Sequence, residues 1–172
     1  GLIKWQLPTQ SSNILNETYK FKISKLVSDE NSIYFSNNKN QFYSIDYKTG
    51  TINWINEINS NLTPIINDNF IFTVSDEGYL YVLDKIKGNI IRINYLFENY
   101  KLKIRKKIKP IGFSIGNTNL YLTNNDGKMI IVDLNSGKVI DIQKISGNLV
   151  SKPFIHNQNL FVIKNGSIVQ YN

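Results

Sequence analysis

The sequence predicts an all-β fold made of repeated four-stranded antiparallel sheets. The chain of 172 residues contains no alanine and no cysteine, but it is rich in isoleucine, asparagine and aromatic residues. β-Branched and aromatic residues favour strands and asparagine favours turns, so this composition argues against a helical bundle. Two further observations are a hairpin motif that recurs along the chain and the regular spacing of its copies.

The hairpin motif consists of two alternating strands joined by a short turn of asparagine, aspartate or glycine. It occurs in the segments YFSNNKNQFYSID, FTVSDEGYLYVLD, YLTNNDGKMIIVD and FVIKNGSIVQYN. Such turns need residues that tolerate a positive φ, and we assign this role to Asn40, Gly78, Gly127 and Gly166. In the second copy the four strands are expected at 64–67, 70–75, 79–84 and 89–95.

The spacing of glycines defines the repeat. The second strand of each hairpin ends at an aspartate or asparagine, and a glycine follows four residues later in three copies. With Gly1, these glycines are 49, 38 and 49 residues apart. The repeat units are therefore about 1–49, 50–87, 88–136 and 137–172. Four strands recurring every ~40–45 residues are typical of a β-propeller, whereas a β-sandwich would not keep this period and a β-solenoid has a shorter one.

The turn after each hairpin carries the most specific residues. In SIDYKTGTINW, Asp46 is placed to accept hydrogen bonds from the turn amides, and Gly50 supplies a positive φ. Trp54 follows on the outermost strand, where its indole can fill the gap between neighbouring sheets and donate to a backbone carbonyl. Trp5 stands in the same relation to Gly1. We expect the same structural role for Asp84, Gly88, Asp133 and Gly137.

This segment resembles the tryptophan-docking motif of the PQQ-like β-propeller repeat family, Ala-x-Asp-x-x-Thr-Gly-x-x-x-Trp. The repeat pattern covers essentially the whole chain, but the motif is nearly complete only around Trp54. Arg92 and Asp141 occupy the tryptophan position in two other units. The resemblance implies a single propeller domain over 1–172, or a part of a larger propeller.

The resemblance also implies a function. Quinoprotein dehydrogenases of this family hold a quinone and calcium, whereas its BamB-type members are scaffolds in outer-membrane β-barrel assembly. Similarity to the BamB type implies a non-enzymatic protein-interaction scaffold at the periplasmic face of the outer membrane, with a barrel-assembly subunit as partner and no cofactor. The alternatives are a quinone-dependent oxidoreductase or its remnant, and a ligand-sensing propeller. We expect any targeting segment to lie outside this chain.

The residues themselves offer little for catalysis. His156 is the single histidine, and it stands beside a turn without partners for acid–base chemistry. The recurring aspartates are about one sheet apart, which is too far to share a proton. The sequence contains no phosphate loop, no zinc-ligand spacing and no complete calcium loop. We therefore predict no catalytic residue, no cofactor site and no metal site.

The formal charge of +7 favours an acidic protein or an anionic membrane surface as partner, and not nucleic acid. Cations concentrate in YKLKIRKKIK at 100–109, where they alternate with apolar residues. We predict a strand whose cationic face is a candidate partner surface, formed by Lys101, Lys103, Arg105, Lys107 and Lys109. The segment YKFKISK at 19–25 shows the same alternation with fewer cations. Edge lysines can also serve only to discourage aggregation.

The two ends of the chain are complementary. Residues 1–7, GLIKWQL, have the pattern of an outermost strand, and the last unit stops at the strand that precedes one. Residues 1–7 can therefore complete the last sheet and close a ring. Because four sheets are few for a closed ring, we expect either a fragment of a larger propeller or a homodimer that completes one.

Overall fold

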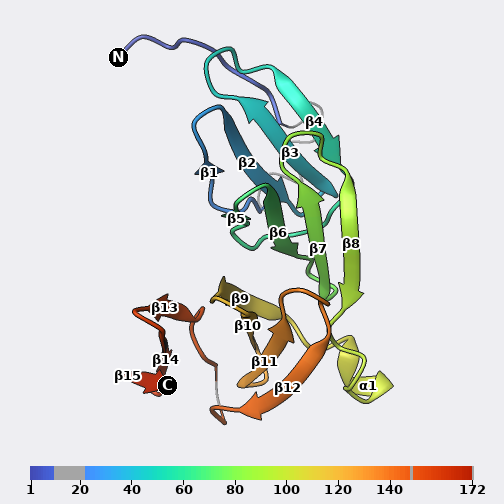
Figure 1. The fold of residues 1–172 in the computed structure, drawn as a ribbon, viewed down its shortest axis with the longest axis vertical. Helices are drawn as coiled ribbons and strands as arrows, with labels where there is room; N and C mark the ends of the chain where they lie inside the picture. The colour runs from blue at the N-terminus through green and yellow to red at the C-terminus, as the bar shows by residue number, and fades with distance from the viewer. Residues whose placement is uncertain (10–21, 148, 172) are drawn as a thin grey trace, which may run out of the picture.

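The computed structural model describes residues 1–9, 22–147 and 149–171. Four antiparallel sheets follow one another along the chain and stand side by side around an open arc (Figure 1). Within each sheet the strands pair in chain order. This arrangement confirms the predicted all-β fold of propeller-type sheets.

The strands of the four sheets have the following bounds. The first sheet contains β1 (Val27–Ser28), β2 (Ser32–Asn37), β3 (Gln41–Asp46) and β4 (Ile52–Asn56). The second contains β5 (Ile65–Asn67), β6 (Phe70–Val74), β7 (Tyr79–Asp84) and β8 (Ile90–Tyr95). The third contains β9 (Pro110–Ile115), β10 (Asn119–Asn124), β11 (Lys128–Asp133) and β12 (Val139–Lys144). The fourth contains β13 (Phe154–His156), β14 (Asn159–Lys164) and β15 (Ser167–Tyr171).

The hairpins turn where the sequence predicts. Asn40 has a φ of 57°, and the turn glycines of the other three hairpins have φ between 73° and 90°. Only glycine adopts this region without cost, and asparagine tolerates it better than other residues. Each fourth strand lies beyond the glycine that starts the next repeat unit, so a sheet spans the end of one unit and the start of the next.

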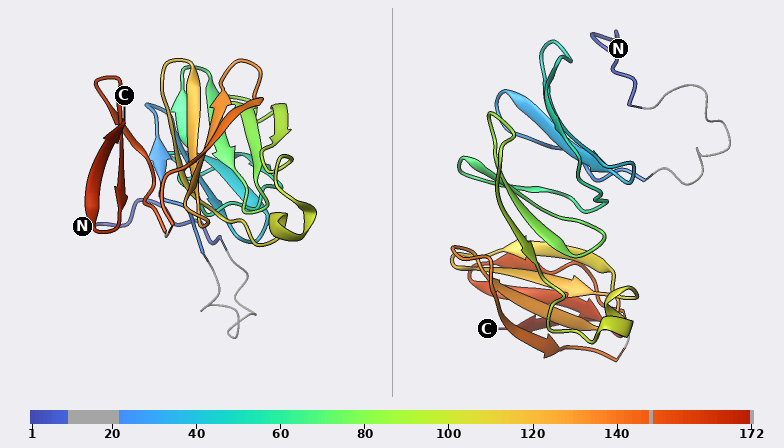
Figure 2. Two further views of the ribbon diagram at one scale, coloured as in Figure 1. Left: turned by 90° about the horizontal axis from the view of Figure 1, so that it is seen from below. Right: turned by 90° about the vertical axis from the view of Figure 1, so that its right-hand side faces the viewer.

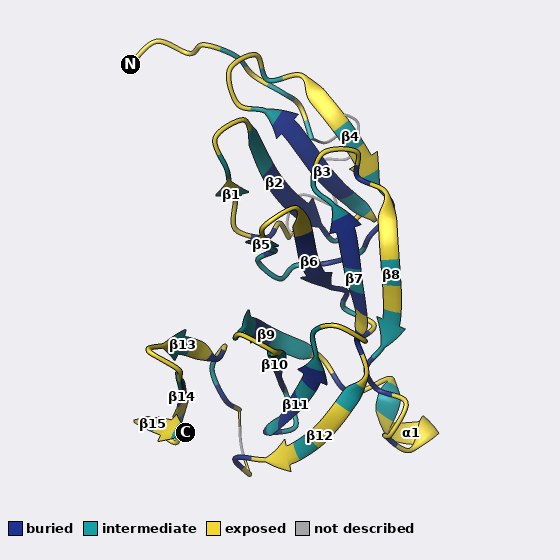
Figure 3. Cartoon of the chain, in the orientation of Figure 1, coloured by how far each residue is buried: buried dark blue, intermediate teal, exposed yellow. Residues whose placement is uncertain are grey.

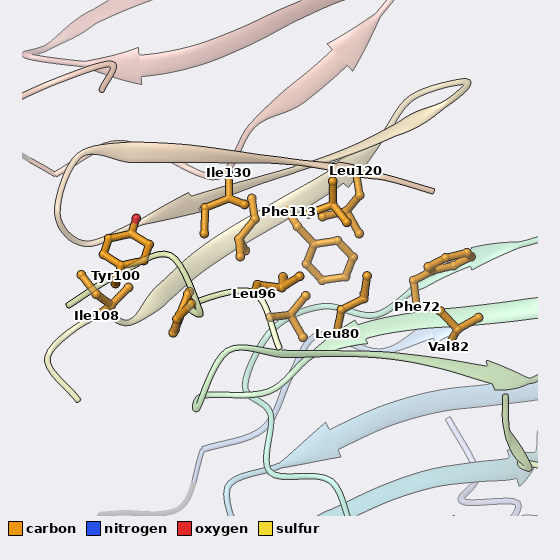
Figure 4. Close-up of a cluster of buried hydrophobic side chains, with 13 residues drawn as sticks. Phe72, Leu80, Val82, Leu96, Tyr100, Ile108, Phe113, Leu120 and Ile130 are labelled. Carbon is orange, nitrogen blue, oxygen red and sulfur yellow. The ribbon is translucent and has the colours of Figure 1, made fainter. Parts of the chain in front are cut away.

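The core lies between the sheets, because each sheet is apolar on both faces. In the largest cluster, Phe72 and Leu80 of the second sheet face Phe113 and Leu120 of the third (Figure 4). Leu96, from the connection between these sheets, is fully buried among them. The central strands of the first three sheets are mostly buried, whereas β4, β8 and β12 lie exposed along the outer rim (Figure 3).

The strand predicted at 100–109 is wrong. The chain forms a short helix there, α1 (Leu102–Arg105), between the buried side chains of Tyr100 and Ile108. No described strand offers a ladder partner at this position, so the backbone satisfies its own hydrogen bonds, as from Ile104 N–H to the Lys101 carbonyl. In the second lysine-rich segment, 19–25, residues 19–21 lie outside the described part of the chain. Ile23 of this segment forms an isolated bridge with Asn37.

Residues 1–7 do not complete the last sheet within the chain. They form no strand, and they lie at the end of the arc opposite to β13–β15 (Figure 2). The physical reason is the curvature of the arc, because four sheets do not bring its two ends together. No helix among the described residues is long and apolar enough to cross a membrane.

Candidate functional site

The turn after each third strand is held by its aspartate. Asp46 Oδ1 accepts hydrogen bonds from the backbone N–H of Lys48 at 3.0 Å and of Thr49 at 2.8 Å, and from Thr49 Oγ1 at 2.9 Å. Asp84 and Asp133 make the corresponding bonds in the next two sheets. Gly50, Gly88 and Gly137 close these turns with φ between 71° and 73°.

These bonds favour the charged form of the carboxylates. The backbone and side-chain donors of Thr49 lower the pKa of Asp46 below its ordinary value of 3.8. The hydroxyl and the backbone N–H of Ser136 lower the pKa of Asp133 in the same way. The recurring aspartates therefore serve as turn caps, each in its own sheet.

A tryptophan of one sheet lies on the turn glycine of the next. The indole of Trp54, on β4, covers Gly88 so closely that a Cβ atom there would lie 2.5 Å from Trp54 Cδ2. Its Nε1–H donates to the Lys85 carbonyl at 3.2 Å. Trp5 covers Gly50 in the same manner and donates to the Tyr47 carbonyl at 3.0 Å. We call each such contact, between a docking side chain and the turn that it covers, a seam.

Arginine replaces tryptophan at the third seam. The Arg92 guanidinium, on β8, donates to the carbonyls of Leu134 and Asn135 in the turn that Gly137 closes. Asn94, two residues further along β8, also lies against Gly137. Its counterpart Asn56, on β4, donates from Nδ2 to the Gly88 carbonyl at 2.7 Å.

Sequence reasoning overlooked these asparagines as seam residues. The available signal was their constant position six residues after a unit glycine, on the same face as the docking residue. The seams at Gly88 and Gly137 thus each have two contacts from a fourth strand, made by the fourth and the sixth residue after the glycine of the preceding unit.

The candidate partner surface is a projecting loop, residues 101–107, which we call the cationic loop. Lys101, Lys103 and Lys107 are exposed, and Lys106, which the prediction omitted, is exposed as well. Arg105 instead turns inward, where its Nε donates to the Tyr100 carbonyl at 2.8 Å. The prediction of a cationic strand face is therefore wrong. The exposed lysines lie on a loop that contains a short helix, and Arg105 is not one of the exposed cations.

Two buried anchors fix the cationic loop. Tyr100 and Ile108 both belong to the core cluster between the second and third sheets. Burial raises the pKa of Tyr100 to about 12, so this anchor stays neutral. Lys109 follows the second anchor, and its charge acts on the nearby Asp76. Between the anchors, Leu102 is 74% and Ile104 is 43% exposed.

The concave side of the arc holds an open groove of about 500 Å³. Ile65, Ile115 and Ile155, from the first strands of three sheets, line it together with His156. The His156 ring stacks on Phe154, with the ring centroids 6.3 Å apart. Within residues 1–9, 22–147 and 149–171, no three side chains of histidine, aspartate and glutamate gather in a way that could hold a metal ion.

Comparison with known proteins identifies the family. The profile of the family described as "Outer membrane protein assembly factor BamB" matches residues 1–94. The chain belongs to this PQQ-like β-propeller family. No curated protein matches the chain.

Solved structures agree on the fold. BamB from Moraxella catarrhalis aligns with 86% of this chain and 41% of its own, at 16% identity and a TM-score of 0.67. The computationally designed Ika8 protein aligns with 87% of this chain and 45% of its own, at 14% identity and a TM-score of 0.69. The Cps50 (Swd1) β-propeller domain from Myceliophteria thermophila aligns with 81% and 48%, at 12% identity and a TM-score of 0.61. The chain thus spans less than half of each of these proteins.

Proposed function

We propose that this PQQ-like propeller chain is a non-enzymatic protein-interaction scaffold of the bacterial cell envelope, of the BamB type. Family membership supports a scaffold related to outer-membrane protein assembly. The periplasmic face of the outer membrane is the corresponding location, and a barrel-assembly subunit is the corresponding partner. The recurring aspartates cap their own turns and the two tryptophans are engaged in the seams, so partner binding falls to other surfaces.

The cationic loop is the observation that carries this proposal. Four of its lysines are exposed, and none of them forms an ion pair with an acid among the described residues. Leu102 and Ile104 add exposed apolar area beside these charges. A surface with an apolar centre and a charged rim is typical of protein interfaces. The lysines attract an acidic partner at long range, and the apolar residues are then buried on contact.

The loop is also held ready for binding. Arg105 ties it to the second sheet through the Tyr100 carbonyl and lies over the Tyr95 ring, 5.8 Å from the centroid. A loop fixed at both ends and in its middle loses little conformational entropy when a partner binds. This arrangement favours a recognition element over an edge that merely discourages aggregation.

The test is an affinity capture from detergent-solubilised bacterial envelope at low and at high salt. The wild-type chain should retain a barrel-assembly subunit at low salt and release most of it at high salt, because screening weakens long-range attraction. A variant with Lys101, Lys103, Lys106 and Lys107 changed to glutamate should retain at least about tenfold less. The matched control changes four exposed lysines outside the loop, Lys48, Lys87, Lys138 and Lys144, to glutamate and should bind like the wild type.

Two results would count against the scaffold. If the loop variant and the control variant lose binding equally, only net charge matters and the loop is not the recognition element. If no envelope protein is retained and the purified chain binds a quinone together with calcium, the oxidoreductase alternative replaces this proposal.

A further inference from the structure

A pocket of about 360 Å³ opens at the base of the cationic loop, beside the second sheet. This volume lies within the range of ligand pockets in proteins. The turn between β6 and β7 contributes two acids to it, Asp76 and Glu77, and the end of the cationic loop contributes Lys106. We call it the charged pocket. Both its walls come from the middle of the chain, so its lining does not depend on either end of the arc.

Two amide side chains hold the carboxylates of the charged pocket in place. Asn61 Nδ2 donates to Asp76 Oδ2 at 2.6 Å, and Asn59 Nδ2 donates to Glu77 Oε1 at 2.7 Å. The backbone N–H of Asp76 donates to the Asn59 carbonyl at 2.9 Å. Neither carboxylate forms an ion pair within the described part of the chain. The pocket therefore presents two positioned acids whose charge is not balanced at contact distance.

The position of Asp76 is unfavourable for a negative charge. Burial is the main reason that the pKa of Asp76 lies above its ordinary value of 3.8, and the charge of Glu77 acts in the same direction. The Asn61 backbone N–H and the charges of Lys109 and Lys22 lower this pKa, but they do not cancel the effect of burial. A cation that entered the pocket would offset this cost, because a nearby opposite charge favours the ionised carboxylate.

Two tyrosines add an aromatic surface to the charged pocket. Tyr79 and Tyr95 lie opposite each other on β7 and β8, with their ring centroids 4.8 Å apart. The Arg105 guanidinium already lies over the Tyr95 ring. Tyr79 is 38% exposed, and no cation of the described residues lies over its ring. Because a cation is attracted to the face of a tyrosine ring, Tyr79 offers a place for a second one.

The cations of the charged pocket are less suited to hold a ligand than its acids. Arg105 directs its donors to the carbonyls of Tyr100 and Glu98, and it is thereby part of the loop's own structure. Lys106 and Lys109 are exposed, and no printed bond fixes their side chains. An anion would thus meet two solvated lysines, whereas a cation would meet two anchored carboxylates and a tyrosine ring. The lysines suit acidic groups next to that cation.

We propose that the charged pocket receives an arginine side chain of the protein partner, from a segment in which acidic residues flank that arginine. The guanidinium pairs with Asp76 and Glu77 and stacks on Tyr79, because its planar fork suits both carboxylates and aromatic faces. The flanking acids face Lys106 and the cationic loop. This inference rests on the proposed function for the presence of a protein partner, and it deepens that function by naming the residue that anchors the partner.

Two synthetic peptides test the charged pocket on the purified chain. One peptide carries a single arginine between two glutamates. The other carries citrulline in place of the arginine, which keeps the shape of the side chain and removes its charge. In a calorimetric titration the arginine peptide should bind at least about tenfold more tightly. Equal affinities, or no binding of either peptide, would overturn the proposal. Binding of vesicles of an ethanolamine phospholipid without binding of the arginine peptide would overturn it as well.

Three variants test which side chains hold the arginine. Glu77→Gln should weaken binding of the arginine peptide at least about tenfold and leave the citrulline peptide unaffected. Glu98→Gln is the matched control, because Glu98 is an exposed acid that follows β8 and does not line the pocket. Tyr79→Leu should weaken the arginine peptide about two- to fivefold. If Glu77→Gln and Glu98→Gln had equal effects, only net charge would matter and the proposal would fail.

The capture from bacterial envelope separates failure of this inference from failure of the proposed function. Glu77→Gln should retain clearly less of the envelope partner than the wild type. If it retains as much while the variant of the cationic loop loses the partner, the charged pocket is not the anchor and the scaffold proposal stands. If the arginine peptide binds as predicted but the wild type retains no envelope protein, the pocket is an arginine site and the scaffold proposal fails.

Discussion

Gly88 decides how closely two sheets approach at a seam. The Trp54 ring lies where a methyl group on residue 88 would be, and the backbone there has a positive φ of 73°. A larger residue therefore meets two separate penalties, one from the backbone conformation and one from the indole. The same holds for Gly50 beneath Trp5.

Gly88→Ala should separate these penalties when it is compared with Gly166→Ala. Gly166 has a similar φ of 75°, but no atom lies within 4 Å of the added methyl group. Both variants should lose about 1–2 kcal/mol of unfolding free energy from the left-handed conformation. Gly88→Ala should lose about 1–3 kcal/mol more, because the indole must move. Equal losses in denaturant unfolding would show that the indole does not rest on the glycine.

The Asp46 turn should weaken in acid. Because the pKa of this carboxyl is lowered in the folded chain, its contribution is present above the ordinary value of 3.8 and is lost as the pH falls through the folded pKa. Asp46→Asn should thus be less stable than the wild type at about pH 7 and approach it at about pH 3. The control is Glu57→Gln, which changes an exposed carboxylate outside any turn. Its difference in stability from the wild type should not depend on pH in this way. A difference in unfolding free energy between the wild type and Asp46→Asn that widens in acid would contradict the role of the carboxylate.

At the scale of elements, the cationic loop shows that a hydrophobic pattern does not say which of its apolar residues are buried. Lysines alternate with apolar residues from 101 to 104, and this period of two predicts a strand. The structure buries Tyr100 and Ile108 and leaves Leu102 in solvent. Which apolar residues are buried depends on the distance between the second and third sheets, and this distance is a property of the packed molecule.

Paired alanine substitutions check this assignment. Ile108→Ala should lower the unfolding free energy by about 2–5 kcal/mol, because Ile108 is only 3% exposed within the largest core cluster. Leu102→Ala should change it by no more than about 0.5 kcal/mol. If the two variants were equally destabilised, a strand that buries both residues would be the better description.

The hairpins and their capped turns were predictable because their signals are local. A positive φ at Gly78 and a carboxylate two residues before the amides it caps are set by a few neighbouring residues. The use of Arg92 in place of tryptophan was not predictable in the same way. Its guanidinium reaches carbonyls 42 and 43 residues further along the chain, in another sheet.

At the scale of the whole molecule, the arc has two unlike ends. One end carries residues 1–7 without a sheet, and the other carries a sheet without its fourth strand (Figure 1). Propellers avoid open edges by closing the ring, and sequence alone predicted that residues 1–7 would close it. Within this chain they do not, because four sheets leave the two ends of the arc apart, and this curvature cannot be inferred from strand spacing. The expectation of a larger propeller, formed by one longer chain or by a homodimer, stays a prediction.

Hydrogen exchange of the backbone amides, compared between the wild type and Gly88→Ala, tests most directly whether the sheets are joined through their seams. Because Trp54 of β4 rests on Gly88, the variant should lose protection both in β4 and in the turn at residues 85–89, whereas Gly166→Ala should lose it only in its own hairpin. A loss of protection confined to residues 85–89, or the same pattern in both variants, would show that the first and second sheets are not coupled at this seam.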